Sequence, residues 1–345
     1  MNDQSKFLPT KQELQTLRKH LNNIREAVVL THIGPDQDAL MSLTAWSYIL
    51  QINTYGIIRP IYEDEILLEV ADMLSVQTIE RVGNIYQALE RHQPSHVFLV
   101  DINHIHRLTK KNQEQLKNFL ENKTTTIVID HHETPMDFKP AFSIIKPLAS
   151  NCELIYYISK DLGLEINKAA QNLIIGILSD TAGCKYAQQD RRPSTYTTKA
   201  LFELSKNPTT NMRDAVTRSY MKLTQDMLPF VQEFLNNLVI KENLAYTYAD
   251  YTTLSDKEQI PARRAKSYVL QEILTKLNKP VYYILSKNKD KIKVSFRSIP
   301  PISIRKLAES LGGGGHDFAA GAYINSNDLM QLIEHINTKI KHLFS

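Results

Sequence analysis

Residues 27–40, A-V-V-L-T-H-I-G-P-D-Q-D-A-L, pass from a short apolar run into a turn that holds one histidine and two aspartates. The run at 27–30 is short and is followed by a turn, which is typical of a buried strand. The carboxylates of Asp36 and Asp38 stand two positions apart, where they repel each other and favour neither a helix nor a buried strand. We therefore expect positive charge to lie between these two side chains.

Four apolar runs in the first half of the chain are each followed by polar, mostly acidic side chains. The runs cover residues 27–30, 96–100, 126–129 and 173–178. The side chains that follow them include His32, Asp101, Asp130, His131, His132 and Asp180. The first three runs indicate buried parallel strands, whereas the length of the fourth and its start after a polar segment indicate a helix. Because sites in open α/β sheets lie beyond the carboxyl ends of the strands, these polar residues mark a candidate site.

The alternation of strands and helices predicts the fold class. Helical patterns at residues 39–52 and 109–120 lie between the apolar runs, which is typical of an α/β domain with a parallel sheet. After residue 205 the pattern changes, and residues 212–238 read as one long helical connector. Beyond it, strand-like and helical runs alternate at residues 244–251, 262–277, 281–286, 292–297, 303–311 and 319–324, before a final helix.

We therefore predict an α/β protein of two domains that face each other across a cleft. The first domain, with a parallel sheet, covers residues 1–205, a helical connector covers 206–238, and a smaller α/β domain covers 239–345. A chain of 345 residues with 42% hydrophobic content is long enough for two such cores.

Composition excludes several classes of protein. The net charge of +4, from 41 basic and 37 acidic residues without a basic stripe, argues against a dedicated binder of long nucleic acid. No apolar run approaches the roughly 20 residues of a membrane-spanning helix, and the N-terminal segment is polar. The two cysteines, Cys152 and Cys184, are too few for a disulfide framework. A cytoplasmic location without membrane contact is therefore predicted.

The polar residues at the ends of the runs form a ligand set for divalent metals. Carboxylates together with imidazoles suit Mn²⁺ better than Mg²⁺. One carboxylate can bridge two ions about 3.5–4 Å apart, which is the arrangement used for in-line displacement at phosphorus. The alternative is that each residue only forms a turn or caps a strand, as single aspartates often do. The set comprises His32, Asp36, Asp38, Asp101, Asp130, His131, His132 and Asp180.

Five motifs, in this order, resemble those of the DHH phosphoesterase superfamily. They are H-I-G-P-D-Q-D-A at 32–39, V-D-I-N at 100–103, D-H-H at 130–132, S-D-T at 179–181 and G-G-G-G-H at 312–316. The last resembles the motif of the associated C-terminal domain. The superfamily includes nanoRNase/pAp-phosphatase enzymes of the NrnA type, cyclic-di-AMP phosphodiesterases and the RecJ nucleases. Family II inorganic pyrophosphatases share the first domain but carry a different second one.

The resemblance implies a role for each matching residue. It implies two Mn²⁺ ions, with Mg²⁺ as the alternative. The implied ligands of one ion are His32 and Asp36, those of the other are Asp38, His131 and Asp180, and Asp101 bridges the two. Asp101 and His132 would be catalytic, with His132 facing the phosphate and Asp130 holding a ligand imidazole in its working tautomer. The implied substrate-binding residues of the second domain are Arg297, Gly313, Gly314, Gly315 and His316.

Three positions keep a second interpretation. Gln37 stands where relatives commonly have glycine, and it is either tolerated or alters the approach of the backbone to the substrate. The glycine run at 312–315 is either a loop whose N–H groups approach a phosphate or a flexible linker. Arg297 either grips a phosphate through bidentate hydrogen bonds or is an ordinary surface arginine.

The resemblance implies a metal-dependent phosphoesterase whose first domain carries the chemistry. The expected substrates are short 5′-phosphorylated oligonucleotides, pAp or both. One alternative is a cyclic-di-AMP or pApA phosphodiesterase, and another is a non-catalytic nucleotide-binding protein. No long duplex nucleic acid is expected as a partner, and a homodimer is left open.

Overall fold

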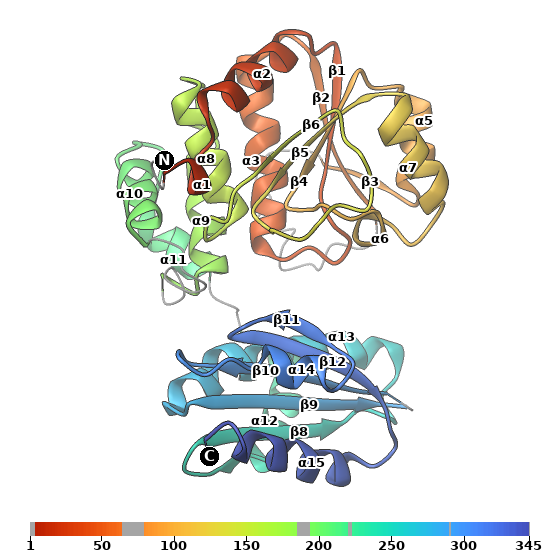
Figure 1. Ribbon diagram of the computed structural model, residues 1–345, viewed down its shortest axis with the longest axis vertical. Helices are drawn as coiled ribbons and strands as arrows, with labels where there is room; N and C mark the ends of the chain where they lie inside the picture. Colours follow the sequence, from red (N-terminus) through yellow and green to blue (C-terminus); the bar gives the residue numbers. More distant parts are fainter. Residues whose placement is uncertain (1–3, 64–78, 185–193, 220–222, 290, 345) are drawn as a thin grey trace. The chain divides into compact units, whose positions relative to one another are not determined.

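The computed structural model describes residues 4–63, 79–184, 194–219, 223–289 and 291–344 (Figure 1). The chain divides into two compact units, Met1–Tyr220 and Met221–Ser345. The domain boundaries at residues 205 and 238 stay predictions.

The first unit is built on a six-stranded parallel sheet with the strand order β3-β2-β1-β4-β5-β6. Its strands are β1 Glu26–Leu30, β2 Ile57–Glu63, β3 Glu80–Val82, β4 His96–Val100, β5 Thr125–Asp130 and β6 Phe142–Ile145. The order reverses between β1 and β4. In open α/β sheets, ligand sites lie beyond the carboxyl ends of the strands at such a point.

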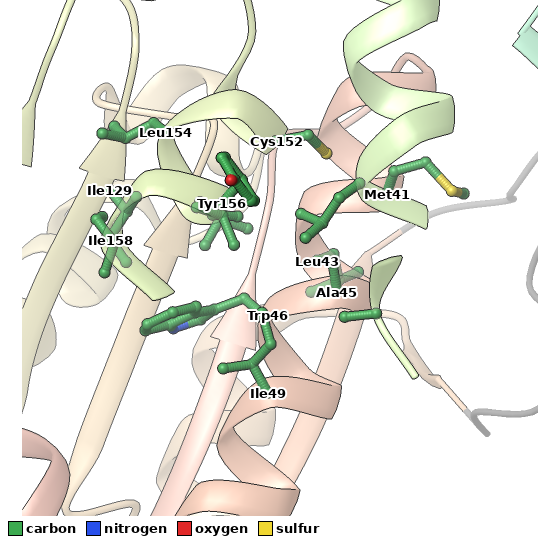
Figure 2. Close-up of a cluster of buried hydrophobic side chains, with 14 of the residues drawn as sticks. Met41, Leu43, Ala45, Trp46, Ile49, Ile129, Cys152, Leu154, Tyr156 and Ile158 are labelled. Carbon is green, nitrogen blue, oxygen red and sulfur yellow. The ribbon is translucent and has the colours of Figure 1, made fainter. Parts of the chain in front are cut away.

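Both faces of the parallel sheet are buried, as the unbroken apolar runs predict. Alternate strand residues pack into two cores on opposite faces. One core contains α3 Gln37–Asn53, α8 Asn151–Asp161 and α9 Ala170–Asp180, and the other contains α5 Ile85–His92 and α7 Gln113–Asn122. Figure 2 shows side chains of the first core, among them Trp46 of α3, Ile129 of β5 and Tyr156 of α8. This packing fixes the helix starts at the edge of the sheet where the candidate site lies.

Five further helices complete the described part of the first unit. They are α1 Gln4–Phe7, α2 Lys11–Asn22, α6 Ile105–Leu108, α10 Ser194–Ser205 and α11 Met212–Ser219. Thr10 caps α2 in a capping box with Glu13, in which each side chain accepts a hydrogen bond from the other's backbone.

The second unit also contains a six-stranded sheet, in the order β11-β12-β10-β9-β8-β7. The strands are β7 Val239–Ile240, β8 Leu244–Asp250, β9 Val281–Asn288, β10 Lys291–Ser298, β11 Gly314–His316 and β12 Ala319–Asn325. β8 and β9 run parallel, and the other neighbours are antiparallel. The helical segments are η2 Gln225–Met227, α12 Leu228–Asn236, α13 Asp256–Tyr268, η3 Val269–Ile273, η4 Leu274–Leu277, α14 Arg305–Glu309 and α15 Leu329–Lys341.

The predicted fold class is confirmed: both units are α/β, and the first carries the parallel sheet. The three predicted parallel strands and the helix at 173–178 are also confirmed. The predicted helical connector at 212–238 contains two α-helices, α11, which ends at Ser219, and α12, which begins at Leu228 with Pro229 in its first turn. α7 begins at Gln113, later than the pattern at 109–120 indicates.

Within the described residues, every helix falls short of the length or the apolar character needed to cross a membrane.

Candidate metal centre

Six of the predicted ligands, together with His132, gather beyond the carboxyl ends of β1, β4 and β5. Their donor atoms fall into three groups, and within each group the atoms lie within 4.8 Å of one another. The groups are Asp101–His131–His132, His32–Asp36–Asp101 and Asp38–His131–Asp180. Asp101 and His131 each belong to two groups, so the three groups form one continuous cluster.

Backbone carbonyls fix the orientation of two imidazoles in the cluster. Nδ1 of His32 lies 3.0 Å from the carbonyl oxygen of Ile33, and Nδ1 of His131 lies 3.1 Å from that of Leu148. A carbonyl can only accept a hydrogen bond, so Nδ1 carries the proton in both rings. Each Nε2 therefore presents a lone pair, as a metal-ligating histidine does.

These lone pairs face carboxylate oxygens. Nε2 of His32 lies 3.7 Å from Asp101 Oδ2, and Nε2 of His131 lies 3.3 Å from Asp101 Oδ1. Both His32 Nε2 and Asp101 Oδ1 are buried, and neither has a hydrogen-bond partner among the described residues. Burial lowers the pKa of His32, which disfavours the imidazolium form of this ring. A divalent cation satisfies both atoms at once, and the donor set therefore fits a metal.

The pKa values of the carboxylates point to the same conclusion. Burial, and then the neighbouring Asp38 and Asp36, raise the pKa of Asp101 well above its usual range. Burial and Asp36 raise the pKa of Asp38 to about 6. Without added positive charge, the full ionisation of these carboxylates is strongly opposed.

Backbone amides hold the two closely spaced aspartates apart. Asp36 caps α3, since its Oδ1 accepts a hydrogen bond from the N–H of Ala39 at 3.0 Å. The buried carboxylate of Asp38 accepts the N–H of Asn151 at 2.6 Å and that of Cys152 at 3.1 Å, in the first turn of α8. The positive end of the α8 dipole thus stabilises the carboxylate of Asp38. The carboxylate of Asp36 belongs to another donor group, with His32 and Asp101.

Asp130 contacts His132 and lies outside the three donor groups. Its Oδ1 accepts a hydrogen bond from His132 Nδ1 at 2.8 Å and one from the N–H of His131, also at 2.8 Å. The imidazole that Asp130 orients is therefore that of His132, and the ring of His131 is oriented by Leu148 instead. With Nδ1 engaged, Nε2 of His132 is the remaining ring atom for a substrate, and this side chain is 22% exposed.

Sequence reasoning missed the backbone groups that position the ligands. These are the N–H groups of Asn151 and Cys152 and the carbonyls of Ile33 and Leu148. One signal was present, because Ser150 and Glu153 have the spacing of a capping box and mark the start of a helix. Ser150 does cap α8 through the N–H of Glu153.

Gln37, the departure in the first motif, is the first residue of α3. Its Nε2 donates a hydrogen bond to the carbonyl of Arg218 at the end of α11, at 3.0 Å. The side chain thus ties the first motif to the last helix of the unit. Neither of the two interpretations of Gln37 included this contact.

Two of the predicted substrate-binding residues, Arg297 and Gly314, line one cavity in the second unit. The cavity has a volume of about 460 Å³ and lies along β10 and β12. Gly313 and Gly315 are near it in sequence but are used differently, as described next. The structure describes the backbone of His316, in β11, and not the position of its side chain.

The glycine run is part of the sheet, so the flexible-linker interpretation is wrong. Gly314–His316 form β11, which pairs with β12. The N–H of Gly313 donates to the carbonyl of Ala308 and closes α14. A Cβ on Gly313 would lie 2.1 Å from the carbonyl oxygen of Gly321, and one on Gly315 would lie 2.6 Å from that of Ala319, whereas one on Gly314 would meet nothing within 4 Å. Two glycines thus permit close packing, and the third opens toward the cavity.

Known proteins resemble this chain in sequence and in fold. Over 212 residues, 61% of the chain, it is 26% identical to the bifunctional oligoribonuclease and PAP phosphatase NrnA of Thermus thermophilus, and the match spans 62% of that relative's length. The crystal structure of an exopolyphosphatase-related protein from Bacteroides fragilis shares the fold, with a TM-score of 0.76 and 19% identity over 96% of this chain and 95% of that one. Thermus thermophilus RecJ in complex with Mn²⁺ has a TM-score of 0.50 and 15% identity, over 97% of this chain and 55% of that one.

Two family models match successive parts of the chain. Residues 26–177, which contain three of the four predicted ligand-bearing strand or helix ends, match the N-terminal domain of the DHH family, and residues 243–342, which contain the glycine run, match the DHHA1 domain. The resemblance inferred from the motifs is therefore confirmed: the chain carries an N-terminal domain of the DHH family followed by a DHHA1 domain.

Proposed function

We propose that this protein is a metal-dependent phosphoesterase that hydrolyses short 5′-phosphorylated oligonucleotides, pAp or both. One observation carries the proposal. Buried imidazole lone pairs face buried carboxylate oxygens at 3.3–3.7 Å. Such an arrangement is unfavourable in itself and becomes favourable around divalent cations.

The donor groups suggest how two ions would be held. His32, Asp36 and Asp101 would bind one ion, and Asp38, His131 and Asp180 the other. Asp101 would contact both, since it also shares a group with His131. Mn²⁺ suits this mixture of carboxylates and imidazoles, and Mg²⁺ is the alternative. When bound, such ions polarise a phosphoryl oxygen and stabilise the charge that develops at phosphorus.

His132 and Asp130 form the part of the site that handles a proton. Asp130 accepts from Nδ1 of His132 and so holds the ring with its Nε2 free for a substrate. Nε2 of His132 can then donate to a phosphoryl oxygen or to the departing oxygen of the ester. The buried carboxylate of Asp130 keeps the ring in this orientation throughout.

The substrate class rests on the second unit and on the relatives. Arg297 and Gly314 line one cavity, where a guanidinium and an unobstructed backbone suit a phosphate. The Thermus relative is described as an oligoribonuclease and PAP phosphatase. Both activities in that name act on nucleotide phosphates, which agrees with the proposed substrates.

The test is a substrate panel on the purified, Mn²⁺-loaded protein, with metal analysis of the same sample. We expect about two Mn²⁺ per chain and release of mononucleotides from 5′-phosphorylated oligonucleotides, or of phosphate from pAp, measured by product chromatography. Turnover of cyclic-di-AMP alone would replace the proposed substrate. A protein that holds no stoichiometric metal and hydrolyses none of these compounds would be a nucleotide-binding protein without catalysis.

A further inference from the structure

One face of the second unit's sheet is covered only in part. Along β10, alternate residues are buried, and Ile292, Val294 and Phe296 pack in the core that contains α15. The residues between them point to the opposite face. On that face α12 and α13 pack against β8 and β9. Beyond α13 the face of β10 and β12 borders two adjoining cavities.

The larger cavity, here termed the lysine cavity, has a volume of about 550 Å³ and lies between α13 and strands β9, β10 and β12. The basic residues that line it are Arg263, Lys266, Lys291 and Lys293. The smaller one, termed the arginine cavity, contains Arg297 and Gly314. Lys293, Ser295 and Tyr323 line both, so the two cavities form one groove along β10.

The lysine cavity carries positive charge that no lining carboxylate balances. Its described lining has four basic side chains and contains neither aspartate nor glutamate. Arg263 donates to the backbone carbonyl of Gln259, and the ammonium of Lys293 lies 5.1 Å from the centre of the Tyr323 ring. Neither contact brings a negative charge. Positive charges around one cavity repel each other, and an anion between them removes that repulsion.

Lys266 is the most informative of the four basic residues. Its side chain is buried, with 6% of the residue exposed, and yet it borders the cavity. Nζ donates to Ser286 Oγ at 3.1 Å and to the carbonyl of Lys293 at 3.2 Å. An ammonium has three N–H donors, and the third finds no acceptor among the described residues. Burial and the nearby Lys293 lower the pKa of Lys266, which an anion in the cavity would raise again.

We propose that the lysine cavity binds an internal phosphodiester of an oligonucleotide whose 5′-terminal phosphate is held at the arginine cavity. This inference rests on the proposed function and extends it, because it assigns the substrate a length. Lys293 is four residues from Arg297 on β10, which is about 13 Å along an antiparallel strand. A stacked nucleic-acid strand advances about 3.4 Å per nucleotide, so several nucleotides span this distance. The lysine cavity thus favours oligonucleotides over dinucleotides and pAp.

The test measures binding without chemistry. The full chain is titrated in chelator against a 3′-fluorescein-labelled, 5′-phosphorylated pentanucleotide and the matching dinucleotide, with fluorescence anisotropy as the readout. Lys266→Met keeps the length of the side chain, and Arg263→Gln changes an exposed residue, so that at least one of the two variants keeps the fold. Lys341→Met, at the end of α15 outside the cavity lining, is the matched control.

We expect each cavity variant to lower the ratio of pentanucleotide to dinucleotide affinity about tenfold, the effect of one lost hydrogen bond to a charged group. The control should leave the ratio unchanged. An unchanged ratio in both cavity variants would overturn the inference. A second result would also overturn it: inorganic phosphate raises the melting temperature of the wild type but not that of Lys266→Met, while the affinity ratio stays the same. That result would indicate a site for a free anion.

The failure of this inference and of the proposed function are distinguishable. If the wild type hydrolyses the oligonucleotides with Mn²⁺ while the affinity ratio is the same in the wild type and in the cavity variants, only the inference fails. If the ratio falls as expected but no nucleotide is hydrolysed, the binding groove stands and the proposed catalysis fails.

Discussion

At the scale of single residues, Asp101 combines three unfavourable features. Its backbone has φ +58°, in the left-handed region, its side chain is buried, and its carboxylate faces several others. Strain of this kind persists where the surroundings and a function require it. Because these features are present without metal, the effect of the Asp101 charge on the free energy of unfolding can be measured separately from its effect on catalysis.

Asp101→Asn should lower hydrolysis by about three orders of magnitude or more, because it removes the oxygen expected to contact both ions. In chelator the same variant should be more stable than the wild type by roughly 1–3 kcal/mol, since the charge repulsion is gone and asparagine tolerates positive φ. Thermal unfolding with and without Mn²⁺ measures this. Asp161→Asn, at the exposed end of α8, is the control. Near-wild-type activity of Asp101→Asn would rule out the bridging role.

Gly176 tests how closely the ligand cluster is packed without changing a ligand. A Cβ at this position would lie 2.2 Å from Cys152 Sγ and 2.9 Å from Asp38 Oδ1. Gly176→Ala should therefore destabilise the protein by about 1–3 kcal/mol and weaken Mn²⁺ binding. Gly83→Ala, where a Cβ meets nothing within 4 Å, is the matched control. Equal Mn²⁺ affinity of the two variants in a titration would show that Asp38 has room to move.

At the scale of secondary-structure elements, the neighbouring glycines Gly313 and Gly314, at the start of β11, have different roles. Gly313→Ala should lower the free energy of unfolding by about 1–3 kcal/mol, because the new methyl group meets the backbone of β12. Gly314→Ala has open space and should keep stability but weaken binding of a 5′-phosphorylated nucleotide, since its methyl group enters the arginine cavity. Urea unfolding and nucleotide titration of both variants measure the two effects. Equal losses of stability would contradict this division.

The elements also show why some of the structure was predictable and some was not. Parallel strands buried on both faces leave unbroken apolar runs in the sequence, and the acidic residues that follow them were found for that reason. Four consecutive glycines carry no strand signal, since β11 exists through its pairing with β12. The start of α8 was readable from its capping residues, but its contact with Asp38 joins positions 113 residues apart in the chain. Such contacts depend on tertiary packing.

At the scale of the whole molecule, Lys266 links stability to pH. Burial holds its pKa in the folded protein well below the usual value near 10.4. Between these two pKa values the unfolded chain binds more protons, so this residue makes the free energy of unfolding rise with pH in that window. Below the window its full cost remains.

Lys266→Met should therefore be more stable than the wild type at neutral pH, and the difference should shrink as the pH approaches about 10. Urea unfolding of both proteins in chelator, from pH 7 to pH 10, measures this. Lys341→Met serves again as the control and should show no such trend. A difference in stability that does not depend on pH would mean that Lys266 is neutral or fully charged in both states throughout.

The hydrogen bonds between Asp38 and the first turn of α8 have a consequence for the order in which the ions bind. Each oxygen that already accepts an N–H group of Asn151 or Cys152 has one lone pair fewer for a cation. Both oxygens of Asp38 are engaged in this way, whereas Asp36 uses only Oδ1, for the N–H of Ala39, and keeps Oδ2 for a cation. The His32–Asp36–Asp101 group should therefore fill first, with a half-loaded protein at low Mn²⁺ concentration. Electron paramagnetic resonance should then show an isolated Mn²⁺ signal that gives way to a coupled pair as the second ion binds, and the protein would respond to metal supply in two steps.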